Sequence, residues 1–178
     1  MVDLEVQINM NIGNVKIKNR LVLAPLAGYT NTVYRKICHD LGAGLTYTEM
    51  ISDKGLLYYN DKTWDLCFID QNEHPTSLQL FGGNIEEITK AAILIDKKTN
   101  CDIIDINMGC PVKKVLKSGS GSYLLQDVNY IEKMVRSIVD NVSKPVTCKI
   151  RLGWDHKTIN HIEIAKACER GGASAICV

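Results

Sequence analysis

The chain lacks the long apolar runs and the leader pattern that would direct it into a membrane. Runs such as "LVLAPLAG" and "AAILI" fall far short of the ~20 apolar residues that a bilayer-spanning helix needs. The N-terminal "MVDLEVQINMN" also lacks the basic and then apolar order of a signal peptide. We therefore expect a cytoplasmic protein with no membrane partner.

The cysteines form neither a disulfide framework nor a metal site by their spacing. Their number is odd, seven, and no Cys-x-x-Cys pair or His at metal-ligand spacing accompanies them. Most stand in apolar segments such as "VTCKI" and "SAICV", where Cys behaves as a small buried hydrophobic residue. Cys110 is the exception, because it follows an apolar run instead of lying inside one. The net charge of +1 means that any nucleic-acid-binding surface must be local.

Short apolar runs alternate with longer segments of helical period from residue 21 onward, which is typical of repeated βα units and a parallel sheet. The predicted strands are residues 21–25, 45–50, 77–81, 102–107, 146–150 and 174–178. The predicted helices lie near residues 31–41, 52–58, 84–97, 127–141 and 158–170. Residues 60–76 read as an irregular insert whose Trp64 and Phe68 pack inward. Alternation around "NIGN" predicts a small hairpin within residues 6–19, which in a barrel would close the N-terminal end.

Six strands joined by helices fit either an open doubly wound α/β sheet or part of an eight-stranded barrel. No G-x-G-x-x-G follows the first strand, where "APLAGYTN" stands instead, and this disfavours the doubly wound sheet. The sequence is shorter than the ~250 residues typical of a barrel, and it stops inside an apolar strand. We therefore predict an incomplete TIM (β/α)8-type barrel, with residues 1–178 as the N-terminal portion of a longer barrel domain.

Polar residues at the predicted strand exits are the candidates for chemistry, because active sites of such barrels gather there. Lys149 ends a buried strand and needs an anionic partner, which is either a ligand or a core acid such as Glu49 or Asp105. Gln79 is either a satisfied core amide or, together with Lys149, a source of donors and an acceptor for a polar heterocycle.

Cys110 stands just beyond the strand predicted at residues 102–107. A free thiol has a pKa of roughly 8.5 and is mostly protonated at neutral pH, so it suits a proton donor. It could also be a nucleophile, if Lys113 and Lys114 lower that pKa, or an inert loop cysteine. Gly119 and Gly121 indicate a flexible or closely approached loop, and their spacing does not match a phosphate-binding P-loop.

Four ordered motifs carry a resemblance to a known family. They are "LAPLAGYTNTVYRKICHDLGAGLTYTEM", "SLQLFGGNIEEITKAA", "DIIDINMGCPVKKV" and "VTCKIRLGWD". Together they resemble the tRNA-dihydrouridine synthases, most closely the bacterial B-type branch, and the likeness covers residues 17–178. The combination of "NMGCP" with "KIRLGW" is highly specific.

The resemblance implies a TIM barrel that binds FMN, followed by a small helical tRNA-binding domain. In that family NADPH reduces the flavin, which then reduces a particular uridine of tRNA to 5,6-dihydrouridine. Carried over to this sequence, Pro25, Leu26 and Ala27 would line the flavin, while Gln79 and Lys149 would bond its polar edge. A cation there favours the negative charge that develops on the reduced ring.

The same resemblance assigns the substrate side of the site. Asn107 would hydrogen-bond the uracil, and Cys110 would deliver a proton to C5 after hydride reaches C6. The uridine must leave its stack to react, so basic side chains should hold the tRNA backbone. Lys113 and Lys114, with Lys117, are the candidates, although each could equally be an ordinary solvated lysine.

Two alternatives remain open from the sequence. One is another FMN-dependent TIM-barrel oxidoreductase resembling dihydroorotate dehydrogenase, which explains "NMGCPVKK" less well. The other is a truncated, non-catalytic RNA-binding remnant. The last barrel strands and the helical tRNA-binding domain would lie beyond Val178, so we expect residues 1–178 alone to be poorly soluble, because unpaired strand edges promote association.

Overall fold

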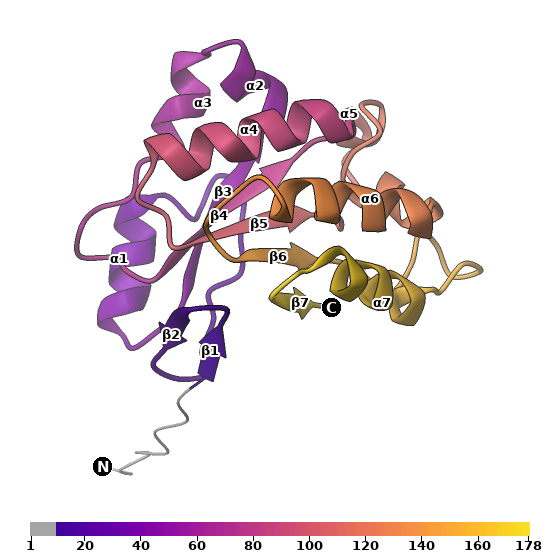
Figure 1. The fold of residues 1–178 in the computed structure, drawn as a ribbon. Helices are drawn as coiled ribbons and strands as arrows, with labels where there is room; N and C mark the ends of the chain where they lie inside the picture. The colour runs from indigo at the N-terminus through magenta and orange to yellow at the C-terminus, as the bar shows by residue number, and fades with distance from the viewer. Residues whose placement is uncertain (1–9) are drawn as a thin grey trace.

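The computed structural model describes residues 10–178, and these begin with a small antiparallel hairpin (Figure 1). Strands β1 (Met10–Ile12) and β2 (Val15–Ile17) pair with Met10 opposite Ile17. Ile12 and Ile17 are buried against Leu45, Tyr47 and Ile103, which lie at the starts of the main strands. The predicted hairpin is therefore confirmed, apart from residues 6–9, which lie outside the described residues, and it covers the N-terminal end of the sheet.

The main sheet has five parallel strands arranged in the order of the sequence. They are β3 (Thr46–Ser52), β4 (Thr76–Phe81), β5 (Ile103–Asn107), β6 (Val146–Lys149) and β7 (Ala175–Cys177). A doubly wound sheet reverses its strand order at a switch point, and this sheet has no reversal among its strands. Figure 1 shows the helices α4, α6 and α7 lying along the same side of the sheet. Parallel strands in sequential order with helices on one side are the arrangement of a TIM barrel, as predicted.

The helices connect consecutive strands, as parallel pairing requires. They are α1 (Thr32–Asp40), α2 (Asp53–Leu57), α3 (Asp61–Asp65), α4 (Ile85–Lys98), α5 (Lys113–Leu116), α6 (Val128–Val139) and α7 (His161–Gly171), with a 3₁₀ helix η1 (Gly121–Gln126) before α6. None of the helices in this part of the chain is long and apolar enough to cross a membrane.

The prediction that residues 21–25 form a full strand is wrong. The segment pairs with the start of β3 through one parallel bridge, Val22 with Leu45. Leu21 is 64% exposed, and Pro25 has no backbone N–H with which to extend a ladder. Among the described residues, this segment pairs on one side only, and it lies beside β3 without becoming a regular strand. We call residues 21–25 the first stave of the barrel wall.

The insert at residues 60–76 is more regular than the sequence indicated. Asn60 caps the short helix α3 by accepting a hydrogen bond from the Thr63 N–H. Trp64 packs against the main core as predicted. Phe68, however, is 59% exposed, so the prediction that it packs inward is wrong.

The outer face of the sheet is apolar and is covered by the helices. Leu78, Leu80, Ile104, Ile106 and Cys148 are fully buried in one cluster with residues of α4, α6 and α7. Because side chains alternate along a strand, these residues leave their neighbours Gln79, Asp105 and Asn107 to face the other side. That inner side carries the candidate site.

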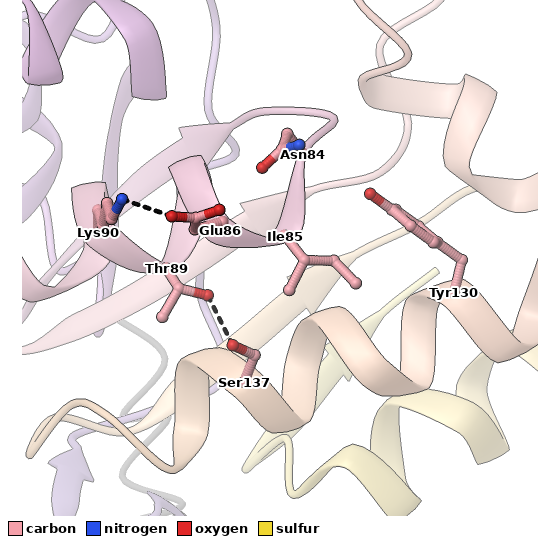
Figure 2. A pocket seen from close by; sticks show the side chains of 7 residues that line it. All are labelled: Asn84, Ile85, Glu86, Thr89, Lys90, Tyr130 and Ser137. Carbon is pink, nitrogen blue, oxygen red and sulfur yellow. Dashed lines mark hydrogen bonds and ion pairs between the residues drawn. The ribbon is translucent and has the colours of Figure 1, made fainter.

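A shallow pocket of about 490 Å³ lies where α4 meets α6, on the outer side of the molecule (Figure 2). Thr89 of α4 and Ser137 of α6 share a hydrogen bond of 2.9 Å across its floor. The Tyr130 hydroxyl donates to the Gly83 carbonyl at 2.8 Å, and Asn84 caps α4 through the Glu87 N–H. These contacts hold the two helices together on the outer side of the sheet.

Candidate active site

Three neighbouring strands carry inward polar side chains at positions that are in register across the sheet. Gln79 of β4 is in register with Asp105 of β5, which is in register with Thr147 of β6. Two residues farther along, Asn107 is in register with Lys149. The inner side chains of a barrel form layers in this way, and here two successive layers are polar.

Hydrogen bonds join these two layers into one chain. Asp105 accepts from the Thr147 hydroxyl at 2.6 Å and from Gln79 Nε2 at 2.6 Å. Gln79 Oε1 accepts from Asn107 Nδ2 at 2.9 Å. The Asn107 carbonyl oxygen Oδ1 in turn accepts from the backbone N–H groups of Gly109 and Cys110, at 3.2 and 3.0 Å. We call these four hydrogen-bonded side chains, Thr147, Asp105, Gln79 and Asn107, the amide relay.

Asp105 is the charged member of the amide relay and is fully buried. Burial raises the pKa of its carboxyl from 3.8 to about 6, against the opposing effects of hydrogen bonds from Gln79 and Thr147 and of the positive charge of Lys149. A buried carboxylate is costly unless it is hydrogen-bonded. The relay supplies those bonds, which offset part of the cost of burying the carboxyl group.

The Cys110 loop rests on a packed support. Asn107 holds its backbone from one side, while the Cys110 carbonyl accepts from the Ser122 N–H at 3.0 Å and from the Ser122 hydroxyl at 3.2 Å. Gly121 lies so close that a Cβ there would come within 2.6 Å of the Cys110 carbonyl oxygen. The prediction of a closely approached loop is therefore confirmed at Gly121, whereas a Cβ at Gly119 would meet only Tyr123, at 3.9 Å. The thiol-bearing residue remains partly exposed.

The loop that follows the first stave is fixed at both ends. The Gly28 N–H donates to Glu49 Oε2, and Thr30 bonds back to Leu26. Behind it, Arg35 donates to the Thr30 carbonyl at 2.7 Å and forms a fully buried ion pair with Glu73 at 2.9 Å. The loop therefore presents Leu26 at a defined place although that side chain is 47% exposed.

Pro25 and Lys149 line one cavity of about 360 Å³ on the inner side of the wall. Tyr47 and Thr147 also line this cavity, which extends to Met10, Asn11 and Ile12 of the hairpin. None of the ion pairs among residues 10–178 includes Lys149. The salt bridge to Glu49 or Asp105 that the sequence left open is therefore not formed. Lys149 acts on Asp105 through its charge alone and keeps its ammonium free for a ligand.

The residues present fit the polar edge of a flavin ring. The cavity supplies an unpaired cation from Lys149 and the flat flank of Pro25, and Leu26 and Ala27 follow on the adjoining loop. Gln79 is less available than the sequence suggested, because it is 1% exposed and both of its amide atoms are bonded inside the relay. One of its two N–H groups remains to reach a ligand.

The basic residues after Cys110 lie on the surface. Lys113 and Lys114 are exposed on the short helix α5, and Lys117 follows it, also exposed. The structure thus brings them next to the Cys110 loop without engaging them in ion pairs. In the described range, no group of three or more His, Cys, Asp or Glu side chains is arranged to hold a metal ion.

Sequence reasoning missed two members of this site. Asp105 entered only as a possible partner for Lys149, and Thr147 did not enter at all. The available signal was the alternation in "DIIDIN" and "VTCKI", which puts Asp105 on the side of Asn107 and Thr147 on the side of Lys149. What it could not supply was the register, which aligns Asp105 with Gln79 and Thr147.

Comparisons with known proteins agree with this arrangement. The family model described as Dihydrouridine synthase (Dus) matches residues 22–178. The chain is 40% identical over 169 residues to tRNA-dihydrouridine synthase B of Pasteurella multocida, which covers 95% of this chain and 51% of that protein. It is 39% identical over 170 residues to the same enzyme of Proteus vulgaris, covering 95% and 52%, and 38% identical to that of Pseudomonas aeruginosa, covering 95% and 51%.

The chain therefore spans about half the length of the curated relatives that it matches. Within that span the family match includes the first stave, all five strands of the sheet and the Cys110 loop. The chain belongs to the dihydrouridine synthase family.

Proposed function

We propose that this chain forms the N-terminal part of the FMN-binding barrel of a tRNA-dihydrouridine synthase. The family fold is a TIM barrel, and the described residues supply its first stave and five parallel strands. The proposed reaction is the reduction of the C5–C6 double bond of particular uridines in tRNA, with NADPH as the source of electrons. The proposal places the protein in the cytoplasm, with tRNA as its partner.

The observation that carries the proposal is the position of Cys110. Its loop leaves the C-terminal end of β5 and is held by Asn107, whose strand neighbour in register is Lys149. A thiol and an unpaired cation therefore stand at the same end of adjacent strands. A substrate ring lying between the thiol and a flavin on Lys149 would be within reach of a proton on one face and of hydride on the other.

Each residue has a separate part in this chemistry. Bound FMN would supply the hydride that uracil C6 accepts. Cys110 Sγ donates its proton to C5, which completes the saturation of the double bond. Lys149 stabilises negative charge at the ring edge, and Pro25, Leu26 and Ala27 form the apolar surface beneath the ring. Lys113 and Lys114, with Lys117, hold the phosphates of the tRNA near the entrance.

The decisive measurement is the dihydrouridine content of tRNA treated with the intact protein and NADPH. Cys110→Ala should abolish or strongly reduce product formation, since typical general acid–base contributions are about 100-fold to 10,000-fold. Cys38→Ala is the matched control, because Cys38 is also partly exposed but lies on α1. Unchanged turnover in Cys110→Ala would remove the proton-donor assignment, and an absence of product with the unaltered protein would favour the RNA-binding remnant.

A second measurement tests the flavin site by itself. Lys149→Met should weaken FMN binding in an absorbance titration, whereas Lys166→Met, an exposed lysine on α7, should leave it unchanged. Equal FMN affinity in the two variants would show that Lys149 does not contact the ring. Replacing NADPH by NADH in the same assay tests the choice of reductant.

A further inference from the structure

Asp105 is a buried charge with no part in the chemistry described so far. It lies one layer below Asn107 and Lys149, it is fully buried, and its two oxygens accept from Thr147 and Gln79. Tyr47 also faces it, and burial together with the Asp105 charge raises the pKa of that phenol, so Tyr47 stays neutral. Lys149 is the cation on the next layer. Because burying a carboxyl group costs stability, its presence at this position indicates a role beyond packing.

Both carboxyl oxygens of Asp105 accept hydrogen bonds, as those of a carboxylate do, and this fixes the direction of the side chains that donate to them. Gln79 must turn its NH₂ group toward Asp105, which leaves Oε1 facing Asn107. Asn107 must then give its NH₂ group to Gln79, which leaves Oδ1 facing the N–H groups of Gly109 and Cys110. If either amide turned over, two donors or two acceptors would meet inside the wall, at a cost of roughly 1–3 kcal/mol for an unsatisfied buried group.

We infer that Asp105 is a positioning residue, which sets the orientation of the Gln79 and Asn107 side-chain amides and thereby holds the Cys110 loop in place. It contacts neither substrate nor cofactor. Its influence passes through two side chains to the backbone of the residue that carries the thiol. The inference deepens the proposed function, since it concerns the same site, but its test needs neither flavin nor tRNA.

The test measures how fast iodoacetamide alkylates Cys110 in the flavin-free intact protein, with Cys38 as the internal reference in the same digest. Asp105→Leu keeps the approximate shape of the side chain but removes the acceptor, so the Asn107 amide loses its fixed direction. We expect Cys110 to react roughly fivefold faster, the change that corresponds to one lost hydrogen bond, while the Cys38 rate stays constant.

Asp105→Asn is the conservative rescue. Its Oδ1 can still accept from Gln79 while its NH₂ group donates to the Thr147 hydroxyl, so the direction of the relay is kept without the charge. The Cys110 rate should return to within about twofold of the original. This variant also controls for the loss of negative charge near the thiol, which Leu and Asn share.

Three results would overturn the inference. They are an unchanged Cys110 rate in folded Asp105→Leu, an equal acceleration of Cys110 and Cys38, and an Asn variant that reacts as fast as the Leu variant. If Asp105→Leu fails to fold, Gln79→Met breaks the relay one step later, and it must accelerate Cys110 alkylation in the same way. No acceleration there would equally overturn the inference.

Turnover supplies an independent readout. Because the exposed lysines that would hold the tRNA phosphates are not part of the relay, Asp105→Leu should lower kcat by a larger factor than it raises KM for tRNA. A rise in KM alone would contradict a positioning role. If the intact protein made no dihydrouridine, the alkylation result would still stand, so failure of the proposed function and failure of this inference are distinguishable.

Discussion

Strands β4 and β5 bury apolar side chains on one face and polar side chains on the other. On the outer face, Leu78, Leu80 and Ile106 are fully buried among apolar side chains of the helices. On the inner face, their immediate neighbours Gln79 and Asp105 are equally buried but polar. Burial alone therefore does not distinguish a structural residue from a functional one in this wall.

The difference teaches where stability and chemistry reside. Each apolar side chain on the outer face gains roughly 1.5–3 kcal/mol from leaving water. The inner face gains little in this way, and it retains its polar groups only because they satisfy one another through the amide relay. The following predictions test this division, beginning with the largest expected effect.

Leu80→Ala should cause the largest loss of stability. The substitution opens a cavity beneath the helices in a fully buried apolar cluster, and such changes cost about 2–5 kcal/mol. Urea denaturation of the intact protein measures the effect. The volume-conserving Leu80→Met should cost less than about 1.5 kcal/mol. If both variants cost the same, the outer face would not be the tightly packed layer described.

Asp105→Asn should change the pH dependence of stability. Because the folded protein raises the pKa of Asp105 from 3.8 to about 6, folding takes up a proton between these values. The original protein should therefore lose stability relative to the variant as the pH rises from about 4 to 6, by up to about 3 kcal/mol. Above that range the difference should be constant. Denaturation curves at several pH values test it, and a difference independent of pH would contradict the raised pKa.

Gly121→Ala should disturb the support of Cys110 more than Gly119→Ala does. Both glycines have positive φ, +63° and +70°, so both variants bear a backbone cost of roughly 1–2 kcal/mol. Only at Gly121 does the new Cβ meet the Cys110 carbonyl oxygen and Val115, which adds a cost of overpacking to that variant alone. Thermal melting and Cys110 alkylation measure the two effects. If the two variants had the same melting temperature and the same rate of Cys110 alkylation, the loop would be able to move away from the new Cβ at no cost.

Asn84→Ala, on the outer side, should have the smallest effect. It removes the side-chain cap of α4 and should cost about 1 kcal/mol of stability without changing the dihydrouridine content of tRNA. Asn84→Asp keeps an acceptor for the cap and should cost less. A loss of product out of proportion to the loss of stability would mean that the pocket in Figure 2 communicates with the active site.

Much of this architecture could be predicted because it depends on local pattern. The alternation of apolar runs and helical segments placed β3 to β7 within a few residues of their observed bounds. Two of the failures have tertiary causes. Within residues 10–178, residues 21–25 have a neighbouring strand on one side only. Phe68 lies on an insert whose packing depends on contacts distant in the sequence, such as the Arg35 bond to the Phe68 carbonyl.

The sequence by itself determined which residues stand at the strand exits, because strand periodicity and the motif around Cys110 are local properties of the chain. Only the tertiary structure decided how those residues are connected. The register between parallel strands depends on contacts between segments that are distant in the sequence, and it aligned Gln79, Asp105 and Thr147 on one layer. That alignment converts a buried carboxylate into the anchor of two amides and of the loop that carries Cys110.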